Sequence, residues 1–427
     1  MIDINLVRKN PDLVKKKTSE KGYDPSIVDK VVEADEKRRG ILKKVEELRS
    51  LKNKAAKEKN IEKGKETKVL LQDVEPKLAE AESELNQFLN SIPNLASDDT
   101  PIGRSEEDNV VIREWGTPPK FDFAPKDHVD LGKDLDIIDV EISAKVSGAR
   151  FAYLKNEAAS IQFALIQFAI ETLTSREIVK EIAQSVGNNF DTPFIFIIPP
   201  VIMKSEVMQK MDRYDPPEER YVFEKDNMVF VGSAEHTLGP MYMDQTLLEK
   251  DLPIRYIGYS TAFRREAGSY GKDTRGILRV HQFDKLEMES FSTPEQGMKE
   301  HELMVAIQEY FMQKLNLPYQ VMAISTGDMG KPDHKQIDIN TWIPSQNKYC
   351  ETQTADYMTD YQSRRLNTRV NVKGNIEYAH MNDATAFAIG RTLIAVLENN
   401  QQKDGSVNIP KVLQKYMAKE KIEKSTK

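Results

Sequence analysis

Apolar residues between positions 31 and 55 follow a heptad spacing, and most of the positions around them are charged. Arg38 and Lys52 occupy two places of the same seam. A narrow apolar stripe on an otherwise charged segment is typical of a coiled-coil helix. The apolar members of the seam are Val31, Ala34, Ile41, Val45, Leu48 and Ala55.

A second seam follows with alternating spacings of three and four, formed by Leu71, Val74, Leu78, Ala81, Leu85, Phe88 and Ile92. The polar stretch KEKNIEKGKETK (57–68) separates the two seams, so we expect an antiparallel hairpin of two long helices over about residues 27–97. Asp24-Pro25 resembles a helix start. Thirty helical residues would project roughly 45 Å. Pro76 predicts a kink or a late start of the second helix.

The pattern changes after the turn-rich segment IPNLASDDTPIG (92–103), which predicts a boundary between an N-terminal domain (1–103) and a larger domain (104–427). In the larger domain, helical stretches such as 158–173 alternate with strand-like runs. The fold class expected is therefore α+β, with a mostly antiparallel β-sheet flanked by helices. The strand-like runs are FIFII (194–198), VFVG (229–232), FRRE (263–266), ILRVHQF (277–283) and WIP (342–344).

Composition narrows the functional classes. The chain has 427 residues, 39% hydrophobic, and a single cysteine, which excludes an internal disulfide and a multi-cysteine zinc site. It contains no signal-like apolar run and no stretch of the roughly 20 apolar residues that a membrane span requires. We therefore expect a cytoplasmic protein without a membrane segment. Motifs of the P-loop and Rossmann type are also absent from the sequence.

The charges are distributed unevenly along the chain. Residues 1–70 hold 20 Lys and Arg against 13 Asp and Glu, a balance of +7, whereas the whole chain has a net charge of −7. A basic arm on an acidic body is suited to binding a polyanion such as RNA. A solvated charged helix that binds nothing is the alternative.

The segment FRREAGSYGKDTRGILRVHQFDKLE (263–287) predicts a β-hairpin with a highly charged face. On the first strand Phe263 and Arg265 would share one side, and Arg264 and Glu266 the other. On the second strand the residues sharing a side are Arg279, His281, Phe283, Lys285 and Glu287. Arginine suits phosphate, an aromatic ring suits a purine, and a carboxylate suits an ammonium or amino group. The alternative is a salt-bridged outer face of a sheet.

This segment resembles motif 2 of the class II aminoacyl-tRNA synthetases, and GSYGKDTRG, RVHQF and KLE resemble the seryl-tRNA synthetases in particular. The N-terminal hairpin is similar to the tRNA-binding arm of that family, and residues 189–203 look like motif 1. Three further stretches match in order: GSAEHTLGPM (232–241) resembles the Thr-x-Glu loop, PSQNKYCETQTADYMTDYQSRRLN (344–367) the ATP- and metal-binding segment, and HMNDATAFAIGRTLIAVLENNQ (380–401) motif 3.

The resemblance implies an ATP site. Arg264 would hold the α-phosphate and the amino-acid carboxylate, and Phe283 would stack on adenine. Glu351 and Thr354 would bind Mg²⁺ through oxygen. The ATP-binding residues implied are Arg264, Glu266, Arg279, Val280, Phe283, Glu351, Thr354 and Arg391, and the catalytic ones are Arg264, Glu287 and Arg391.

It also implies a serine pocket. Glu287 would bind the serine ammonium, Ser233 and Glu235 would close the pocket, Thr385 would recognise the hydroxyl, and Arg264 would reach the carboxylate. The implied activity is that of a serine–tRNA ligase, which forms seryl-adenylate and then charges tRNA(Ser). Family members are homodimers whose helical arm binds tRNA(Ser). No general base is needed, so His281 is expected to be structural.

The sequence departs from the family pattern at several positions. Ser233 replaces the usual Thr, Gln353-Thr354 replaces Ser-Ser, Asp356-Tyr357 replaces Ser-Asn, and Met381-Asn382-Asp383 replaces Thr-Leu-Asn. An extra carboxylate near ATP is unfavourable, so Asp383 should point away or bind metal. Two alternatives stay open: a class IIa enzyme for another small amino acid, and a synthetase-derived tRNA- or nucleotide-binding protein without charging activity.

Overall fold

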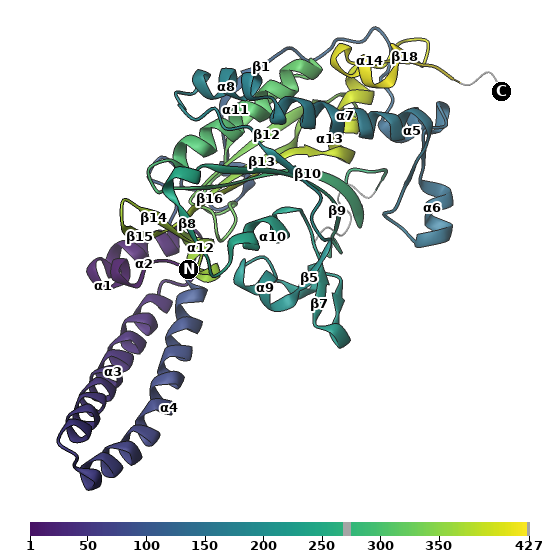
Figure 1. Ribbon diagram of the computed structural model, residues 1–427. Coiled ribbons are helices and arrows are strands. Elements are labelled where there is room, and N and C mark those ends of the chain that lie inside the picture. Colours follow the sequence, from purple (N-terminus) through teal and green to yellow (C-terminus); the bar gives the residue numbers. More distant parts are fainter. Residues whose placement is uncertain (268–274, 425–427) are drawn as a thin grey trace.

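The computed structural model describes residues 1–267 and 275–424. Most of the predicted motif 2 loop GSYGKDTRG therefore lies outside the described residues. Figure 1 shows a body built around a sheet, from which one pair of helices projects as an arm.

The arm consists of helices α3 (Ile27–Lys57) and α4 (Ile61–Ser91), which run antiparallel. This confirms the predicted hairpin. The connection is shorter than the polar stretch 57–68 suggested, because Asn60 caps α4 by accepting a hydrogen bond from the backbone N–H of Lys63. The prediction that the second helix starts late, at Pro76, was wrong, because α4 is helical on both sides of that proline. At the end of the seam Leu89 is buried and Phe88 only half-buried.

The root of the arm joins two short helices, α1 (Ile4–Lys9) and α2 (Pro11–Glu20). Val28, Val31, Leu85 and Leu89 pack there in an apolar cluster that also contains Tyr361 from the body. The arm is therefore anchored at its base by hydrophobic contacts, while its outer half has a separate small core around Val45, Leu48, Leu71, Val74 and Leu78.

The body is organised around an eight-stranded sheet in which neighbouring strands are antiparallel, apart from the parallel pair β4–β9. The mostly antiparallel sheet predicted from the sequence is confirmed. In spatial order the strands are β1 (Val110–Trp115), β11 (Tyr319–Ala323), β12 (Lys335–Ile343), β13 (Lys348–Thr359), β16 (His380–Ala388), β10 (Gln282–Ser292), β9 (Ile254–Phe263) and β4 (Ile195–Ile197).

Helices cover one face of this sheet. Leu286 and Met288 of β10 and Ala384 and Ala386 of β16 belong to the main apolar core with them. Because side chains alternate along a strand, the residues between these point to the opposite face. The covering helices are α7 (Asn156–Thr174), which includes the predicted stretch 158–173, α8 (Arg176–Ser185), α11 (Gly297–Leu315), α13 (Ile389–Asn399) and α14 (Lys411–Met417).

Shorter elements complete the chain. Near the opposite face lie α9 (Ser205–Lys210), α10 (Glu235–Leu238), α12 (Tyr361–Leu366) and two three-stranded sheets. The sheets are β5 (Ile202–Lys204), β7 (Met228–Phe230) and β6 (Val222–Phe223), and β15 (Asn375–Tyr378), β14 (Arg369–Val372) and β8 (Thr246–Leu248). The others are α5 (His128–Asp134), α6 (Val140–Ser147), and the pairs β2 (Ile138–Asp139) with β3 (Tyr153–Leu154) and β17 (Val407–Asn408) with β18 (Lys421–Ile422).

The predicted charged hairpin is shorter than the sequence indicated. Strand β9 ends at Phe263 and β10 begins at Gln282, so Arg264, Glu266 and Arg279 lie on the connection and not on strands. The prediction that FRRE is a strand was wrong beyond its first residue. Glu266 has a φ of 51°, a left-handed conformation that is incompatible with an extended strand.

Within the described residues, no helix combines the length and the apolar character needed to cross a bilayer.

Candidate active site

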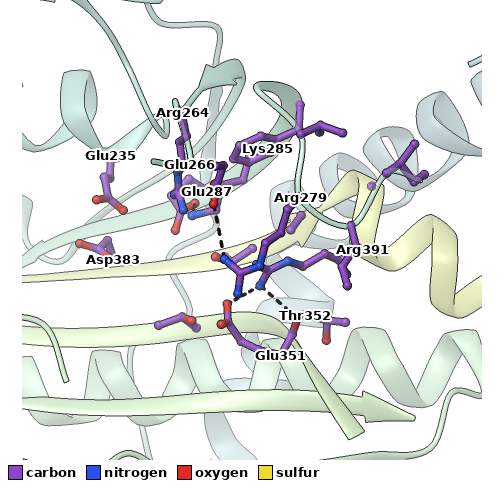
Figure 2. Close-up of a pocket in the computed structure, with 18 of the residues that line it drawn as sticks. Glu235, Arg264, Glu266, Arg279, Lys285, Glu287, Glu351, Thr352, Asp383 and Arg391 are labelled. Carbon is purple, nitrogen blue, oxygen red and sulfur yellow. Dashed lines mark hydrogen bonds and ion pairs between the residues drawn. The ribbon is translucent and has the colours of Figure 1, made fainter. Parts of the chain in front are cut away.

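A cavity opens on the face of the sheet opposite the covering helices, above β10, β13 and β16 (Figure 2). It is lined by every residue predicted for the ATP and amino-acid sites with one exception. That exception is Ser233, which lies just behind the lining. The predicted residues in the lining are Glu235, Arg264, Glu266, Arg279, Val280, Phe283, Glu287, Glu351, Thr354, Thr385 and Arg391.

Arg264 is held at one side of the cavity by its backbone and its side chain. Its backbone N–H donates to the carbonyl of His281 at 3.0 Å, and Nε donates to the carbonyl of Gly232 at 3.1 Å. Nδ1 of His281 lies 3.0 Å from the carbonyl of Arg264, which agrees with a structural role for this histidine. The guanidinium lies 5.3 Å from the ring centre of Phe283, within cation–π distance.

The basic side of the cavity also contains two arginine–glutamate pairs. Arg279 Nη1 donates to Glu266 Oε2 at 3.4 Å, and Arg391 Nη1 donates to Glu351 Oε1 at 2.6 Å. Burial alone would raise the pKa of Glu351, but Arg391 outweighs it and holds that pKa below its usual range. The Glu351 carboxylate is therefore ionised, and its contact orients the Arg391 side chain.

A further carboxyl group stands beside Glu351. Asp338 on β12 lies opposite Thr354 on β13, and burial together with the charge of Glu351 raises the pKa of Asp338 well above its ordinary value. Carboxylate and hydroxyl oxygens are the ligands that a hard divalent cation selects. The group of Glu351, Thr354 and Asp338 therefore fits a magnesium ion.

A row of carboxyl groups crosses three neighbouring strands at the acidic side of the cavity, and two of them, Asp356 and Asp383, line it. In the strand register Glu289 of β10 is opposite Asp383 of β16, and Asp383 is opposite Asp356 of β13. Like charges opposite each other destabilise a sheet. Burial, reinforced by neighbouring carboxylates, raises the pKa of all three well above the ordinary range. Among the described residues, neither carboxyl oxygen of Glu289 has a hydrogen-bond partner.

Arg213 offsets part of this negative charge. Its Nε lies 3.2 Å from Glu235 Oε1, and its Nη2 lies 3.2 Å from Asp383 Oδ2 and 3.8 Å from Asp356 Oδ2. Burial disfavours a charged guanidinium, but these carboxylates outweigh burial and raise the pKa of Arg213 well above its usual value. Asp383 thus lines the acidic side of the cavity and is paired with an arginine that the sequence had not singled out, and its binding of a metal stays a prediction.

Glu287 is tied to two groups at the floor of the cavity. Its Oε2 accepts a hydrogen bond from the hydroxyl of Ser233 at 3.0 Å and is in close contact with Nζ of Lys285. Burial raises the pKa of Glu287, and Lys285 opposes that shift. Glu235 differs, because Arg213 and His236 outweigh its burial and hold its pKa well below the ordinary value. Thr385 lies directly opposite Glu287 in the strand register.

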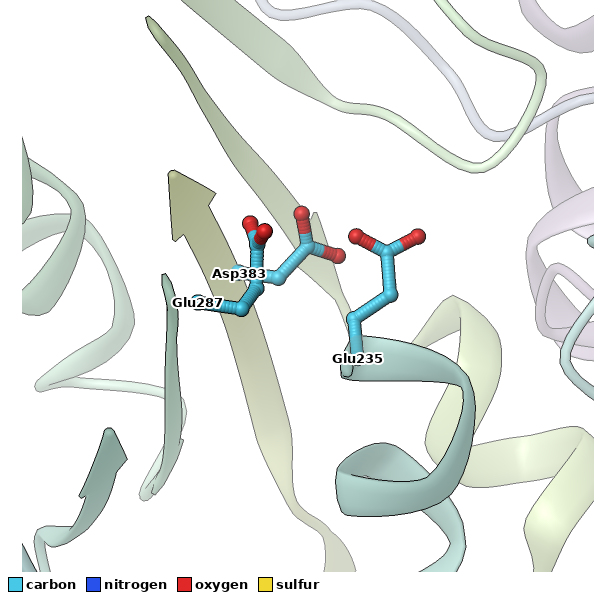
Figure 3. Close-up of side chains that lie close together, drawn as sticks. All are labelled: Glu235, Glu287 and Asp383. Carbon is cyan, nitrogen blue, oxygen red and sulfur yellow. The ribbon is translucent and has the colours of Figure 1, made fainter. Parts of the chain in front are cut away.

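Figure 3 shows Glu235, Glu287 and Asp383 converging from α10, β10 and β16. One oxygen of each carboxylate lies within 4.8 Å of the others. Three oxygens at this spacing can accept the three N–H donors of an ammonium group or hold a divalent cation. Because Arg213 and Lys285 already contact the three carboxylates, a singly charged ammonium adds less repulsion than a divalent ion would.

Comparison with known proteins finds two family models that match this chain. Residues 221–400 match the family described as tRNA synthetase class II core domain (G, H, P, S and T), and residues 1–96 match the seryl-tRNA synthetase N-terminal domain. The serine–tRNA ligase of Dictyoglomus turgidum is 39% identical over 98% of both chains. The chain belongs to the seryl-tRNA synthetase family.

Solved structures extend this likeness to the whole fold. The seryl-tRNA synthetase from Pyrococcus horikoshii, solved with ATP, superposes with a TM-score of 0.89, 34% identity and complete coverage of both chains. The cytoplasmic serine–tRNA ligase from Naegleria fowleri, solved with AMP, gives a TM-score of 0.86, 28% identity and coverage of 100% of this chain and 99% of the other.

The motifs of this seryl-tRNA synthetase family member do not mark three groups in or beside the cavity. Arg213 lies in MDRYDPP, where no local pattern marks it, and Asp338 is the single acid of strand β12 (KQIDINTWI), where no motif marks it either. Lys285 was placed on the correct face but given no role. For Arg213 the available signal was indirect: the unusual acids Asp356 and Asp383 required a nearby cation.

Proposed function

We propose that this protein activates L-serine with ATP and transfers the seryl group to tRNA(Ser). The observation that carries the proposal is the division of one cavity into a side with three arginines, Arg264, Arg279 and Arg391, and a side with converging carboxylates, in a member of the seryl-tRNA synthetase family. A triphosphate suits the first side and an amino-acid ammonium the second.

In the first step the serine carboxylate attacks the α-phosphorus of ATP. A new P–O bond forms, the bond to pyrophosphate breaks, and the products are seryl-adenylate and pyrophosphate. Arg264 stands between the two halves of the cavity and stabilises the charge that develops on the α-phosphate. Arg279 and Arg391 hold the β- and γ-phosphates, Phe283 stacks on adenine, Glu266 accepts from its amino group, and Val280 lines the same site.

The Mg²⁺ that neutralises ATP would be held by Glu351 and Thr354, with Asp338 as an additional acid beside them. Bound there, it would supply positive charge to the phosphates. Arg391, now paired with Glu351, would turn to the phosphates when ATP binds, because the pair and the phosphates compete for the same guanidinium.

On the amino-acid side, Glu287 accepts N–H donors from the serine ammonium, and Glu235 and Asp383 complete its acceptor set. Ser233 fixes the orientation of Glu287, and the Thr385 hydroxyl pairs with that of serine. A hydroxyl site of this kind rejects alanine, because alanine would leave a buried polar group without a partner.

In the second step a ribose hydroxyl at the 3′ end of tRNA attacks the carbonyl carbon of seryl-adenylate, and AMP leaves. The α3–α4 arm, in the basic N-terminal region, binds the tRNA backbone. We further propose that the protein is a cytoplasmic homodimer and that the domains divide near residue 103. Exposed apolar side chains on and beside β4, Ile195, Ile198 and Ile202, suit a subunit interface.

ATP–pyrophosphate exchange across a panel of amino acids tests this function. Exchange should require serine. Exchange with another small amino acid and not with serine would favour the related class IIa activity, for which the acids Asp356 and Asp383 are the supporting observation. Exchange with none would favour a binding protein without charging activity.

A further inference from the structure

Asp212 and Arg213 are consecutive residues that face different parts of the molecule. Arg213 enters the amino-acid side of the cavity, where it contacts Glu235 and Asp383. Asp212 points the other way, towards the root of the helical arm, and its side chain is 9% exposed. Its φ of 59° is left-handed, which allows successive side chains to diverge in this way.

The carboxylate of Asp212 is bound by three groups of the body. Nζ of Lys331 lies 3.1 Å from Oδ2, Nη2 of Arg365 lies 3.2 Å from Oδ1, and the hydroxyl of Tyr361 lies 2.8 Å from Oδ2. Burial would raise the pKa of Asp212, but Arg365 and Lys331 outweigh it and hold that pKa below its usual value. The carboxylate is therefore charged and firmly held.

The same three groups also bind the end of α4. Lys331 Nζ donates to the carbonyl of Asn90 at 2.8 Å, Arg365 Nη1 donates to Asn90 Oδ1 at 3.1 Å, and the Tyr361 hydroxyl lies 3.0 Å from the carbonyl of Ile92. Each partner of Asp212 is thus shared with the arm. A displacement of the arm root must move at least one of them.

A second connection runs from the other side of the root. Lys21, at the end of α2, is buried and donates from Nζ to the carbonyls of Gly330, Lys331 and Asp333. The carboxylate of Asp333 lies 3.9 Å from Nη2 of Arg213. The loop that carries Lys331 is consequently fixed by the arm root at one end and faces Arg213 at the other.

We propose that the root of the helical arm positions Arg213 in the amino-acid pocket, which makes Asp212 a positioning residue for serine recognition. Arg213 contacts both Glu235 and Asp383, holds them in place for the substrate ammonium and keeps Glu235 charged. A shift of Arg213 therefore changes amino-acid affinity and leaves the ATP side, on the far side of Arg264, unaffected. This inference rests on the proposed function.

The test compares Asp212→Asn with wild type in ATP–pyrophosphate exchange. Asparagine tolerates the left-handed backbone and keeps the shape but removes the charge that Lys331 and Arg365 bind. We expect KM for serine to rise about 10-fold, within the range of coupling changes that such networks show, with KM for ATP within about 2-fold of wild type. Serine-dependent exchange by wild type tests the proposed function separately.

Asp35→Asn is the matched control. Asp35 is a buried aspartate with two arginine partners, Arg8 at 2.6 Å and Arg39 at 3.0 Å, inside the N-terminal helices. Both KM values should stay within about 2-fold of wild type in this variant. Where Asp212→Asn fails to give a normal thermal transition, Lys331→Met removes the shared partner instead and should raise KM for serine selectively.

The inference is overturned if the folded variant leaves KM for serine unchanged. It is equally overturned if KM for serine and KM for ATP rise together, because a general structural defect would affect both sides of the cavity.

Discussion

The carboxylate of Glu351 lies 2.6 Å from Nη1 of Arg391, so a predicted metal ligand and a predicted phosphate-binding residue contact each other across the cavity. The pair keeps both side chains ordered at the place where ATP and Mg²⁺ would enter. Binding of ATP would replace this contact, because the phosphates and the Glu351 carboxylate compete for the same guanidinium.

Glu351→Gln should therefore impair adenylate formation. The amide keeps the shape but removes the charge that would hold Mg²⁺, and we expect ATP–pyrophosphate exchange to fall by about 10²–10³-fold. The exchange that remains should require a higher Mg²⁺ concentration. Glu171→Gln is the control, because Glu171 pairs with Lys415 and Tyr416 on the surface. Normal exchange by Glu351→Gln would contradict the assigned role.

Glu287→Ala should affect the amino-acid side of the cavity and leave the ATP side intact. Losing one partner of a buried charged contact costs about 2–5 kcal/mol, so serine-dependent exchange should fall at least about 30-fold. ATP affinity, measured by equilibrium binding without serine, should stay near that of wild type. Glu302→Ala provides the control, because Glu302 pairs with Lys299 at the surface. Parallel loss of ATP binding would show that Glu287 only maintains the fold.

Shortening the arm should separate adenylation from charging. Arg38 and Glu82 lie 3.5 Å apart on facing helices, so residues 40–81 can be replaced by a short Gly-Ser turn while the root cluster around Val31 and Leu85 is kept. Serine-dependent exchange should stay within about 3-fold of wild type, since the shared contacts of Asp212 remain. Charging of tRNA(Ser) should fall by about 100-fold or more, because the phosphate contacts of the arm are lost. Unimpaired charging would refute its role in binding tRNA.

The buried His301 should make the folded protein less stable in acid. Burial lowers the pKa of His301 from 6.5 to about 4, and its Nε2 lies 3.0 Å from the carbonyl of Ala355. Between these pH values the unfolded chain binds a proton at His301 that the folded chain does not. The contribution of His301 to the free energy of unfolding is therefore complete above pH 6.5 and is lost as the pH falls. From pH 7.5 to 5, wild type should lose about 2 kcal/mol more than His301→Gln.

Urea unfolding of both proteins at the two pH values measures this difference. Gln keeps a donor for the Ala355 carbonyl but has no titrating group in this range. Identical pH dependence of the two unfolding free energies would show that His301 is not buried in its neutral form.

The arm and the charged face of β10 were predictable because both depend on local periodicity. Val45 and Leu48 belong to the seam of one helix, and Leu71 and Val74 to the seam of the other. Such seams indicate helices whose partner lies close in sequence. Alternation of Phe283, Lys285 and Glu287 reports one face of a strand. The limits of β9 and β10 were less predictable, because the left-handed backbone at Glu266 leaves no periodic signal.

The sequence by itself thus determined which elements form and which chemical groups the motifs carry: a heptad hairpin, an antiparallel body, and the arginines and glutamates of an adenylate-forming site. Only the tertiary structure decided which charged side chains lie close together. The strand register set Glu289, Asp383 and Asp356 side by side, and a segment without a motif brought Arg213 to them. Local patterns encode the period of each element, whereas contacts between distant segments depend on the packing of the whole chain.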